Sequence, residues 1–228
     1  MKNFGWFQLV RALILSDLHG HSEAFLKAAS LAERLKVELI LVCGDITNFG
    51  HVKQARLLFT SLTDLNLPLL YVPGNCDLSS FLEEKIENAQ NIHASCVKIK
   101  DVTFIGVGGA PSSYLHTPLE FPESWLMDAL NRGFGMCSSE KKLIVLSHTP
   151  PFDTKVDLAY VNRHIGSRSV RRFVEEKEPL AVFCGHVHEA QGIDQIKETL
   201  IANPGPAKRG KYALAEIDDT VEVTFGTF

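Results

Sequence analysis

Five apolar stretches of this sequence end in a small residue that is followed at once by a side chain able to bind a metal ion. The five pairs are Ser16-Asp17, Gly44-Asp45, Gly74-Asn75, Ser147-His148 and Gly185-His186. Two of the stretches add an imidazole two positions further on, at His19 and His188. Carboxylate, amide and imidazole groups are ligands that hard and borderline divalent cations accept. The recurrence of one pattern at five places therefore indicates metal-ion chemistry.

The seven side chains are too many for one tetrahedral zinc ion, and they include none of the thiolates of a structural zinc site. Their number suits two divalent ions that share one carboxylate, roughly 3.5–4 Å from each other. Each short motif has a simpler explanation when taken alone, as a turn, a helix cap or a strand exit. Because turn chemistry does not account for the same placement five times in one chain, we favour a two-metal site.

The elements that must bring these residues together form an alternating pattern. Short runs rich in Val, Ile and Leu, of the length of buried strands, alternate with segments of helical period. In the first half, the expected strands are 11–15, 37–43 and 69–72, and the expected helices are 22–36, 51–65 and 79–85. This order is typical of βαβ units, in which the carboxyl ends of the strands meet at one crevice.

The second half of the chain mixes antiparallel and parallel signals. We expect a hairpin of strands 92–99 and 102–107, helices 123–136 and 167–177, and strands 143–146, 180–184, 199–202, 212–217 and 221–225. The whole pattern predicts an α/β fold in which two mixed β-sheets pack as a sandwich flanked by helices on both sides. No Pro-, Gly- or Ser-rich linker interrupts the chain, so we expect one domain over residues 1–228.

The composition is that of an ordinary globular protein. Of the 228 residues, 45% are hydrophobic and 22% are charged, which excludes a disordered chain. The formal net charge of −4 provides no basic field that would favour nucleic acid as a partner. No apolar run reaches the roughly 18 residues that a membrane span needs. The apolar stretch 4–15 contains Arg11 and runs directly into Asp17, so we do not expect it to be a signal peptide.

The five cysteines are odd in number and form no C-x-x-C pair. We therefore expect neither a disulfide framework nor a cysteine zinc site, and we expect the protein to be in the reducing cytoplasm.

The motifs resemble those of the calcineurin-like metallophosphoesterases. The matching segments, in the order of that family, are Ser16–His21, Gly44–Asn48, Gly74–Asp77, Ser147–Pro150 and Gly185–His188. The resemblance implies a four-layer sandwich and the hydrolysis of phosphoesters by a hydroxide held between two metal ions. It implies that Asp17, His19 and His188 hold the first ion, that Asn75, His148 and His186 hold the second, and that Asp45 bridges both. Two ions of Mn, Fe, Zn or Ni are compatible with such mixed ligands.

One position departs from the pattern of that family. Many members carry a histidine where this chain has Cys76. A thiol is a poor general acid for an alkoxide and cannot offer the positive charge of an imidazolium. We therefore expect good leaving groups or another proton donor, and we expect Cys76 to be a buried spacer. Asp77, the partner of that histidine in the family, is a candidate catalytic residue.

Other residues are candidates for the roles of the absent histidine, which are to donate a proton to the leaving group or to bind phosphate. His164 is the first candidate for the proton donor, ahead of His116 and His21. It precedes a predicted helix that begins with Arg168, and a histidine and an arginine at a helix N-terminus could bind phosphate together. Arg168 and Asn75 are thus the candidate substrate-binding residues. The turn that begins at Asn203 resembles one that supports the metal site in the family.

These observations predict a hydrolase that acts on a small phosphoester, either a phosphodiesterase or a phosphatase of broad specificity. Two alternatives remain open. One is a nuclease, for which the basic segment Lys208–Lys211, together with Arg168, Arg171 and Arg172, would form a local patch. The other is a metal-binding scaffold on the same fold that has no catalytic activity, although such proteins typically lose ligands and all seven are present here.

Overall fold

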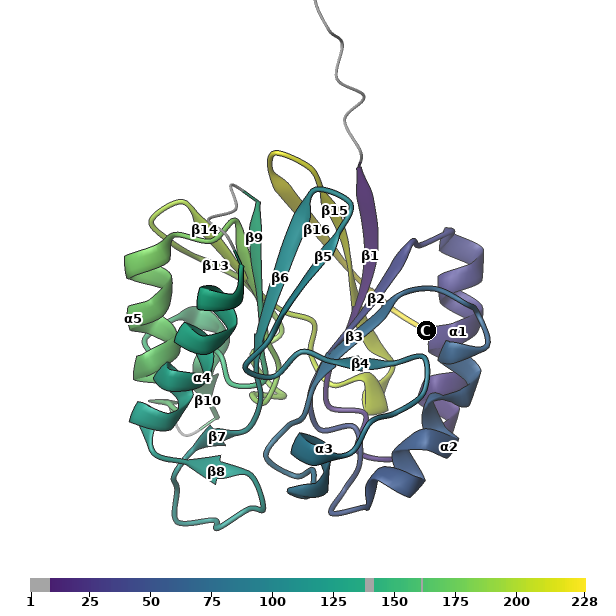
Figure 1. Cartoon of the computed structure of the whole chain (residues 1–228), viewed down its shortest axis with the longest axis horizontal. Coiled ribbons are helices and arrows are strands. Elements are labelled where there is room, and N and C mark those ends of the chain that lie inside the picture. Colours follow the sequence, from purple (N-terminus) through teal and green to yellow (C-terminus); the bar gives the residue numbers. More distant parts are fainter. Residues whose placement is uncertain (1–8, 138–141, 161) are drawn as a thin grey trace, which may run out of the picture.

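The computed structural model describes residues 9–137, 142–160 and 162–228, and its core is a pair of six-stranded β-sheets that face each other (Figure 1). The first sheet has the order β16-β15-β1-β2-β3-β4. Its strands are β1 (Val10–Leu15), β2 (Leu39–Cys43), β3 (Leu69–Val72), β4 (Gln90–Asn91), β15 (Lys211–Ile217) and β16 (Val221–Thr227). Strands β1 to β4 run parallel, whereas β15 and β16 pair antiparallel.

The second sheet has the order β13-β14-β12-β9-β6-β5. Its strands are β5 (Cys96–Ile99), β6 (Val102–Val107), β9 (Leu143–Ser147), β12 (Ala181–Phe183), β13 (Gly192–Ile196) and β14 (Thr199–Asn203). The four inner strands are parallel, and the edge strands β5 and β13 are antiparallel to their neighbours. Two short pairs lie outside the sheets: β7 (Ala110–Pro111) with β8 (Glu120–Phe121), and β10 (Leu158–Ala159) with β11 (Arg163–His164).

Helices cover the outer face of each sheet, which completes four layers (Figure 1). The helices α1 (Ser22–Leu35) and α2 (Val52–Thr63) cover the first sheet, and α4 (Glu123–Met136) and α5 (Arg168–Lys177) cover the second. A short helix, α3 (Ser80–Glu83), and two 3₁₀ turns (Lys155–Asp157, Ala207–Arg209) complete the elements of the described residues.

The burial of both faces of each sheet explains the apolar runs in the sequence. In β1, Leu13 and Leu15 belong to the core shared with α1 and α2, whereas Ala12 and Ile14 belong to the core between the sheets. A third core lies between the second sheet and the helices α4 and α5. A strand that is buried on both sides needs apolar residues at every position, and such continuous runs are typical of parallel sheets.

The predicted fold class, a sandwich of two mixed sheets flanked by helices, is confirmed. The edge strand β13 was not predicted, because its alternating apolar and polar residues (GIDQI) form only a short run. Residues 92–95, which were expected to belong to a hairpin strand, lie before β5 and carry only an isolated bridge at His93. Of the N-terminal apolar stretch, residues 4–8 lie outside the described residues and Val10–Leu15 form β1. In the described part of the chain, no helix combines the length and the apolar character needed to cross a bilayer.

The expectation about disulfides was wrong, because Cys96 and Cys137 are joined. Cys96 begins β5 and Cys137 follows the last residue of α4. The two are 41 residues apart, and no short motif marks them. They come together because α4 packs across β5 and β6, which is a tertiary contact. The remaining cysteines, Cys43, Cys76 and Cys184, are free.

The disulfide predicts the result of a thiol count. After unfolding without reductant, we expect a maleimide to label three thiols per chain, and five after reduction, as read by mass spectrometry. The double variant Cys96→Ser/Cys137→Ser should lower the free energy of unfolding by up to about 4 kcal/mol, since a loop of this length is then no longer closed in the unfolded chain. Five labelled thiols in the unreduced protein would contradict the assignment.

Candidate metal centre

The seven predicted ligands all follow strands that end on the same side of the molecule, at the bottom in Figure 1. In the first sheet, Asp17 and His19 follow β1, Asp45 follows β2 and Asn75 follows β3. The second sheet contributes the three remaining ligands, His148 after β9 and His186 and His188 after β12. The candidate centre therefore lies between the two sheets.

One group of ligand atoms gathers around Asp17. Its Oδ1 lies 3.2 Å from His188 Nε2 and 3.9 Å from His19 Nε2. The two Nε2 atoms are 3.3 Å apart, and Asp45 Oδ2 is 3.4 Å from His19 Nε2. Ligand atoms bound to one tetrahedral ion at about 2.1 Å are about 3.4 Å from one another. The spacing of this group fits a divalent cation.

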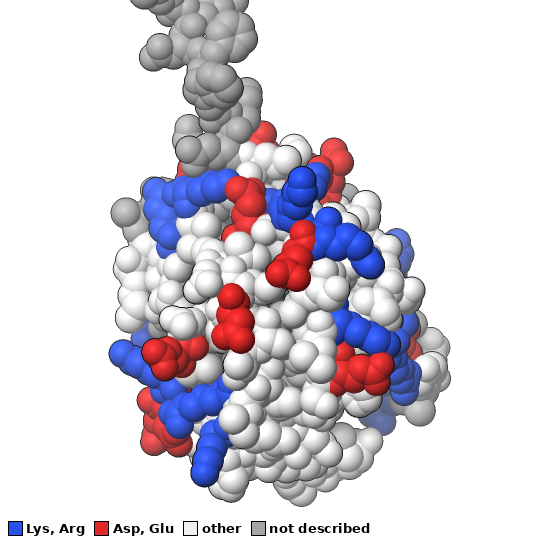
Figure 2. Space-filling model, turned by 90° about the vertical axis from the view of Figure 1, so that its right-hand side faces the viewer, with Lys and Arg blue, Asp and Glu red and all other residues white. Residues whose placement is uncertain are grey.

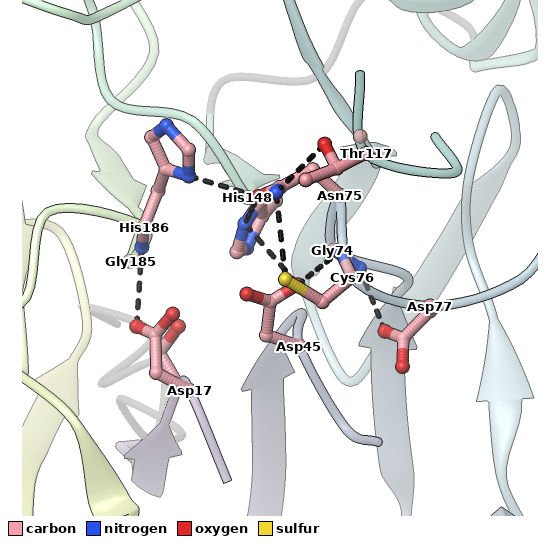
Figure 3. A network of polar contacts seen from close by, with 12 residues as sticks. Asp17, Asp45, Gly74, Asn75, Cys76, Asp77, Thr117, His148, Gly185 and His186 are labelled. Carbon is pink, nitrogen blue, oxygen red and sulfur yellow. Dashed lines mark hydrogen bonds and ion pairs between the residues drawn. The ribbon is translucent and has the colours of Figure 1, made fainter. Parts of the chain in front are cut away.

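A second group gathers around Asn75 (Figure 3). The Oδ1 atom of Asn75 is 2.8 Å from His148 Nε2 and 2.9 Å from His186 Nδ1. Asp45 Oδ1 lies 3.6 Å from His148 Nε2. The two oxygens of Asp45 thus face different groups, Oδ2 toward His19 and Oδ1 toward His148. This arrangement is what a carboxylate shared by two ions requires.

Burial and mutual charge set the protonation of these groups. Burial, followed by the charge of the neighbouring His148, lowers the pKa of His186 to about 4. Burial alone would also lower the pKa of His148, but the charges of Asp45 and Asp17 outweigh it and raise that pKa. The pKa of Asp17 is lowered despite its burial, because of its hydrogen bond with His188 and the charge of His148. His186 is therefore neutral at pH 7, with a lone pair available for a cation.

The backbone at four of the ligands lies in the left-handed region. The φ angles are 54° at Asp17, 46° at His19, 51° at Asp45 and 68° at His186. Residues with a side chain rarely adopt this conformation, and it persists where the surroundings impose it, often at functional sites. The turn after each strand directs these side chains inward, toward one another.

Two glycines allow the loops to approach this closely. Gly44 has a φ of 91°, and a Cβ there would meet the ring of His148. Gly185 follows β12 of the second sheet, and a Cβ there would overlap the side chain of Ser16, which follows β1 of the first sheet. Gly44 therefore serves both the sharp turn and the packing, whereas Gly185 serves the close approach of two loops.

Asp77 is buried and joins two of the ligand loops. Its carboxylate accepts hydrogen bonds from the backbone N–H of Ile46 (3.1 Å), Thr47 (2.8 Å) and Gly74 (2.8 Å), and from the Thr47 hydroxyl (2.8 Å). Burial, followed by the charge of Asp45, raises its pKa to about 6. Both oxygens of Asp77 are occupied by these donors. The geometry therefore shows a structural role and provides no support for the catalytic one.

The other candidates are held by neighbours outside the ligand cluster. His164 Nδ1 is 2.6 Å from Asp157 Oδ1, and the guanidinium of Arg168 lies 4.0 Å from the centre of the Phe152 ring. The expected phosphate position at the N-terminus of α5 is taken by Glu123, which accepts hydrogen bonds from the N–H of Arg168 and Ser169. A carboxylate supplies the negative charge that this helix end favours.

His21 and His116 are both exposed. Among the described residues, neither makes a hydrogen bond or ion pair with a ligand of the centre.

Two supporting residues lie behind the ligands. Asn203 is fully buried, and its side-chain amide donates to the carbonyl of Val187 (2.9 Å) and, at 3.4 Å, to that of Gly185. It thus supports the loop of His186 and His188, in agreement with the expectation from the turn. Thr117 accepts a hydrogen bond from Asn75 Nδ2 at 3.0 Å and was not predicted. Its loop, between β7 and β8, carries no motif, so only the folded structure identifies it.

Comparisons with known proteins agree with this geometry. A family model described as calcineurin-like phosphoesterase matches residues 10–190. The uncharacterised protein MJ1162 of Methanocaldococcus jannaschii is 32% identical over 198 residues, which cover 84% of this chain and 86% of that protein. A probable glycerophosphodiester phosphodiesterase, GpdQ, of Arcobacter nitrofigilis is 29% identical; the match covers 67% of this chain and only 57% of that protein.

Among solved structures, TT1561 of Thermus thermophilus has the same fold. The TM-score is 0.76 at 22% sequence identity, and the match covers 95% of this chain and 99% of that one.

The ion pair of His164 predicts a pH dependence of stability. The hydrogen bond to Asp157 raises the pKa of His164 above its usual value of about 6.5. The pair of His164 and Asp157 therefore stabilises the folded state fully below the usual histidine pKa of about 6.5. This stabilisation disappears as the pH rises through the pKa of His164 in the folded state. Urea unfolding of the wild type and of His164→Asn, from about pH 5 to 9, should give a difference that is largest at low pH. If the difference in the free energy of unfolding does not change with pH, the pair of His164 and Asp157 does not contribute to stability in this way.

The position of Asn203 predicts an effect on metal affinity. Asn203→Ala removes the donor that holds the loop of His186 and His188, and we expect the affinity for divalent cations to fall by about 10–100-fold, as for other groups that orient metal ligands. Titration of the metal-free protein by calorimetry measures this. Exposed Gln195, at the sheet edge, provides the control variant Gln195→Ala, which should bind as the wild type does.

Proposed function

Since this chain belongs to the calcineurin-like phosphoesterase family, we propose that it is a two-metal hydrolase whose substrates are small phosphodiesters. The observation that carries this proposal is the position of Asp45, whose two oxygens face two separate groups of ligand atoms. A single structural ion would not need a second group of three ligands on the far side of one carboxylate.

The assignment of ligands follows from the two groups. Asp17, His19 and His188 would hold one ion, Asn75, His148 and His186 the other, and Asp45 both. Two bound divalent ions would supply a nucleophilic hydroxide and stabilise the negative charge on the phosphoryl oxygens. The chain itself keeps the imidazole of His186 neutral through burial and fixes the direction of the ligands through the backbone turns.

The charge of the centre favours a phosphodiester over a phosphomonoester. In the described residues, the carboxylates of Asp17 and Asp45 form ion pairs only with imidazoles. Lys208 is near enough for its charge to act on His19, but its hydrogen bond to a ligand residue runs from its backbone N–H to the carbonyl of Asp17 and not from its ammonium group. A diester carries one negative charge and a monoester about two, so a site with few fixed cations suits the diester. The name of the GpdQ relative, a probable glycerophosphodiester phosphodiesterase, is consistent with this choice.

The proton for the leaving group has no evident donor in the cluster. Cys76 occupies the position where many family members have a histidine, and His164 is bound to Asp157 instead. A leaving group that departs without protonation avoids this requirement. We therefore propose that phosphodiesters with acidic leaving groups react fastest.

The nuclease alternative receives little support from the surface over α1 and α2. Figure 2 shows Lys and Arg interspersed with Asp and Glu on this face, without a continuous basic stripe. Two of the cations there are paired, Lys27 with Glu23 and Arg56 with Glu84. A nucleic-acid surface needs a row of free cations to replace counterions.

Hydrolysis of bis-p-nitrophenyl phosphate tests the proposal. We expect activity that depends on added Mn²⁺, Zn²⁺, Co²⁺ or Ni²⁺, and we expect Asp45→Asn and His186→Ala each to lower kcat/KM by about 100-fold or more. The control is Arg172→Ala, an exposed residue of α5 paired with Glu176, which should keep the wild-type rate. Absence of activity with every metal, together with protein that binds no metal, would instead favour a scaffold.

A further inference from the structure

Cys76 belongs to the ligand cluster of the metal centre. A ligand atom from each of His19, Asp45 and Cys76 lies within 4.8 Å of the other two. Figure 3 shows the sulfur beside the carboxylate of Asp45 and below Asn75, whose Nδ2 is 3.5 Å from Sγ. The thiol is only half-buried, so the expectation that it is buried was wrong.

We propose that the Cys76 thiolate is an additional ligand of the ion held by His19 and Asp45, and that it makes the centre selective for thiophilic cations such as Zn²⁺ and Co²⁺ over Mn²⁺. This inference rests on the proposed two-metal function. It adds a soft sulfur ligand to a set that otherwise contains only nitrogen and oxygen donors, and soft thiolates favour zinc over hard cations such as manganese.

The distances fit bond formation at one ion. Zinc binds sulfur at about 2.3 Å, imidazole nitrogen at about 2.0–2.1 Å and carboxylate oxygen at about 2.0–2.2 Å. Two ligand atoms at these lengths lie between roughly 3 and 4.4 Å apart, depending on the angle between the bonds. The three atoms of His19, Asp45 and Cys76 lie within 4.8 Å of one another, so small side-chain rotations bring them into this range.

The backbone of Cys76 is already held beside the bridging carboxylate. Its N–H donates to Asp45 Oδ1 at 2.8 Å, and its carbonyl accepts from the N–H of Phe49 at 2.9 Å. Both partners lie in the loop after β2, so the main chain on each side of the sulfur is held by the loop that carries the bridging carboxylate. Only the rotation about the Cα–Cβ bond remains for the thiol to choose its position.

The surroundings of the other two free cysteines differ from those of Cys76. Cys43 and Cys184 are fully buried and belong to two different apolar cores. Cys76 is not packed into any of the three cores. When it binds an ion, its S–H proton leaves to solvent and the sulfur lone pair forms the new bond, so binding releases one more proton than it would without this residue.

Cobalt spectroscopy of the whole 228-residue chain tests the inference without measuring activity. Co²⁺ added to the metal-free protein should produce visible d–d bands, which report binding, and a near-ultraviolet thiolate-to-cobalt band. Cys76→Ser should keep the d–d bands and lose the near-ultraviolet band. The matched control is Cys184→Ala, which removes a buried thiol outside the cluster and should keep both.

Competition with a chelator measures the selectivity. In Cys76→Ser, we expect the affinity for Zn²⁺ to fall by about 10-fold or more and that for Mn²⁺ to stay unchanged, since even supporting groups of metal ligands contribute that much. Thermal unfolding verifies that the variants remain folded.

Three outcomes are informative. Loss of the near-ultraviolet band only in Cys76→Ser supports the inference. The d–d bands without the near-ultraviolet band in the wild type, or a near-ultraviolet band that persists in Cys76→Ser, overturns the thiolate ligand and leaves the two-metal function standing. No cobalt bands at all would overturn both, because the metal centre itself would then be absent.

Discussion

The metal centre depends on holding carboxylates and imidazoles within about 4 Å of one another, several of them out of contact with water. Asp17 and His148 are fully buried, and Asp45 is nearly so. Without a cation, such a cluster costs free energy through desolvation, and the carboxylates are compensated only in part by neighbouring imidazoles. A pair of divalent ions would provide the missing positive charge. The strained turns and the close contact of the ligand loops are understandable as the means of keeping this cluster assembled.

The two sheets contribute to the cluster in different ways. The first sheet supplies every carboxylate and the second supplies His148, His186 and His188, so the site exists only when the sandwich is closed. Asn75 makes the connection, because its side chain contacts His148 and His186 across the interface. Behind the ligands, Asp77 joins the loops after β2 and β3, and Asn203 supports the loop after β12. The packing between the sheets and this second layer of hydrogen bonds therefore determine the geometry of the site together.

Several features of the structure could not be predicted from the sequence, because they depend on contacts between segments that are distant along the chain. The disulfide of Cys96 and Cys137 forms where α4 crosses β5, and no motif marks that crossing. Glu123 caps the N-terminus of α5 from 45 residues away, which removes the phosphate position expected beside Arg168. Thr117 contacts Asn75 from a loop without recognisable pattern. Cys76 was expected to be a spacer. Its place beside His19 and Asp45 could not be predicted, because it depends on the contact between its backbone and the loop after β2.

The sequence by itself determined the four-layer fold and the seven ligand candidates. Continuous apolar runs specify strands buried on both faces, and the polar residue after each run marks the strand end, so the pattern contains the positions of Asp17, Asp45, Asn75, His148 and His186. Only the tertiary structure decided how these residues face one another, which oxygen of Asp45 belongs to which group, and which neighbours hold His164 and Asp77. The physical reason is that sequence periodicity is local, whereas hydrogen bonds and pKa shifts arise between side chains that meet only after folding.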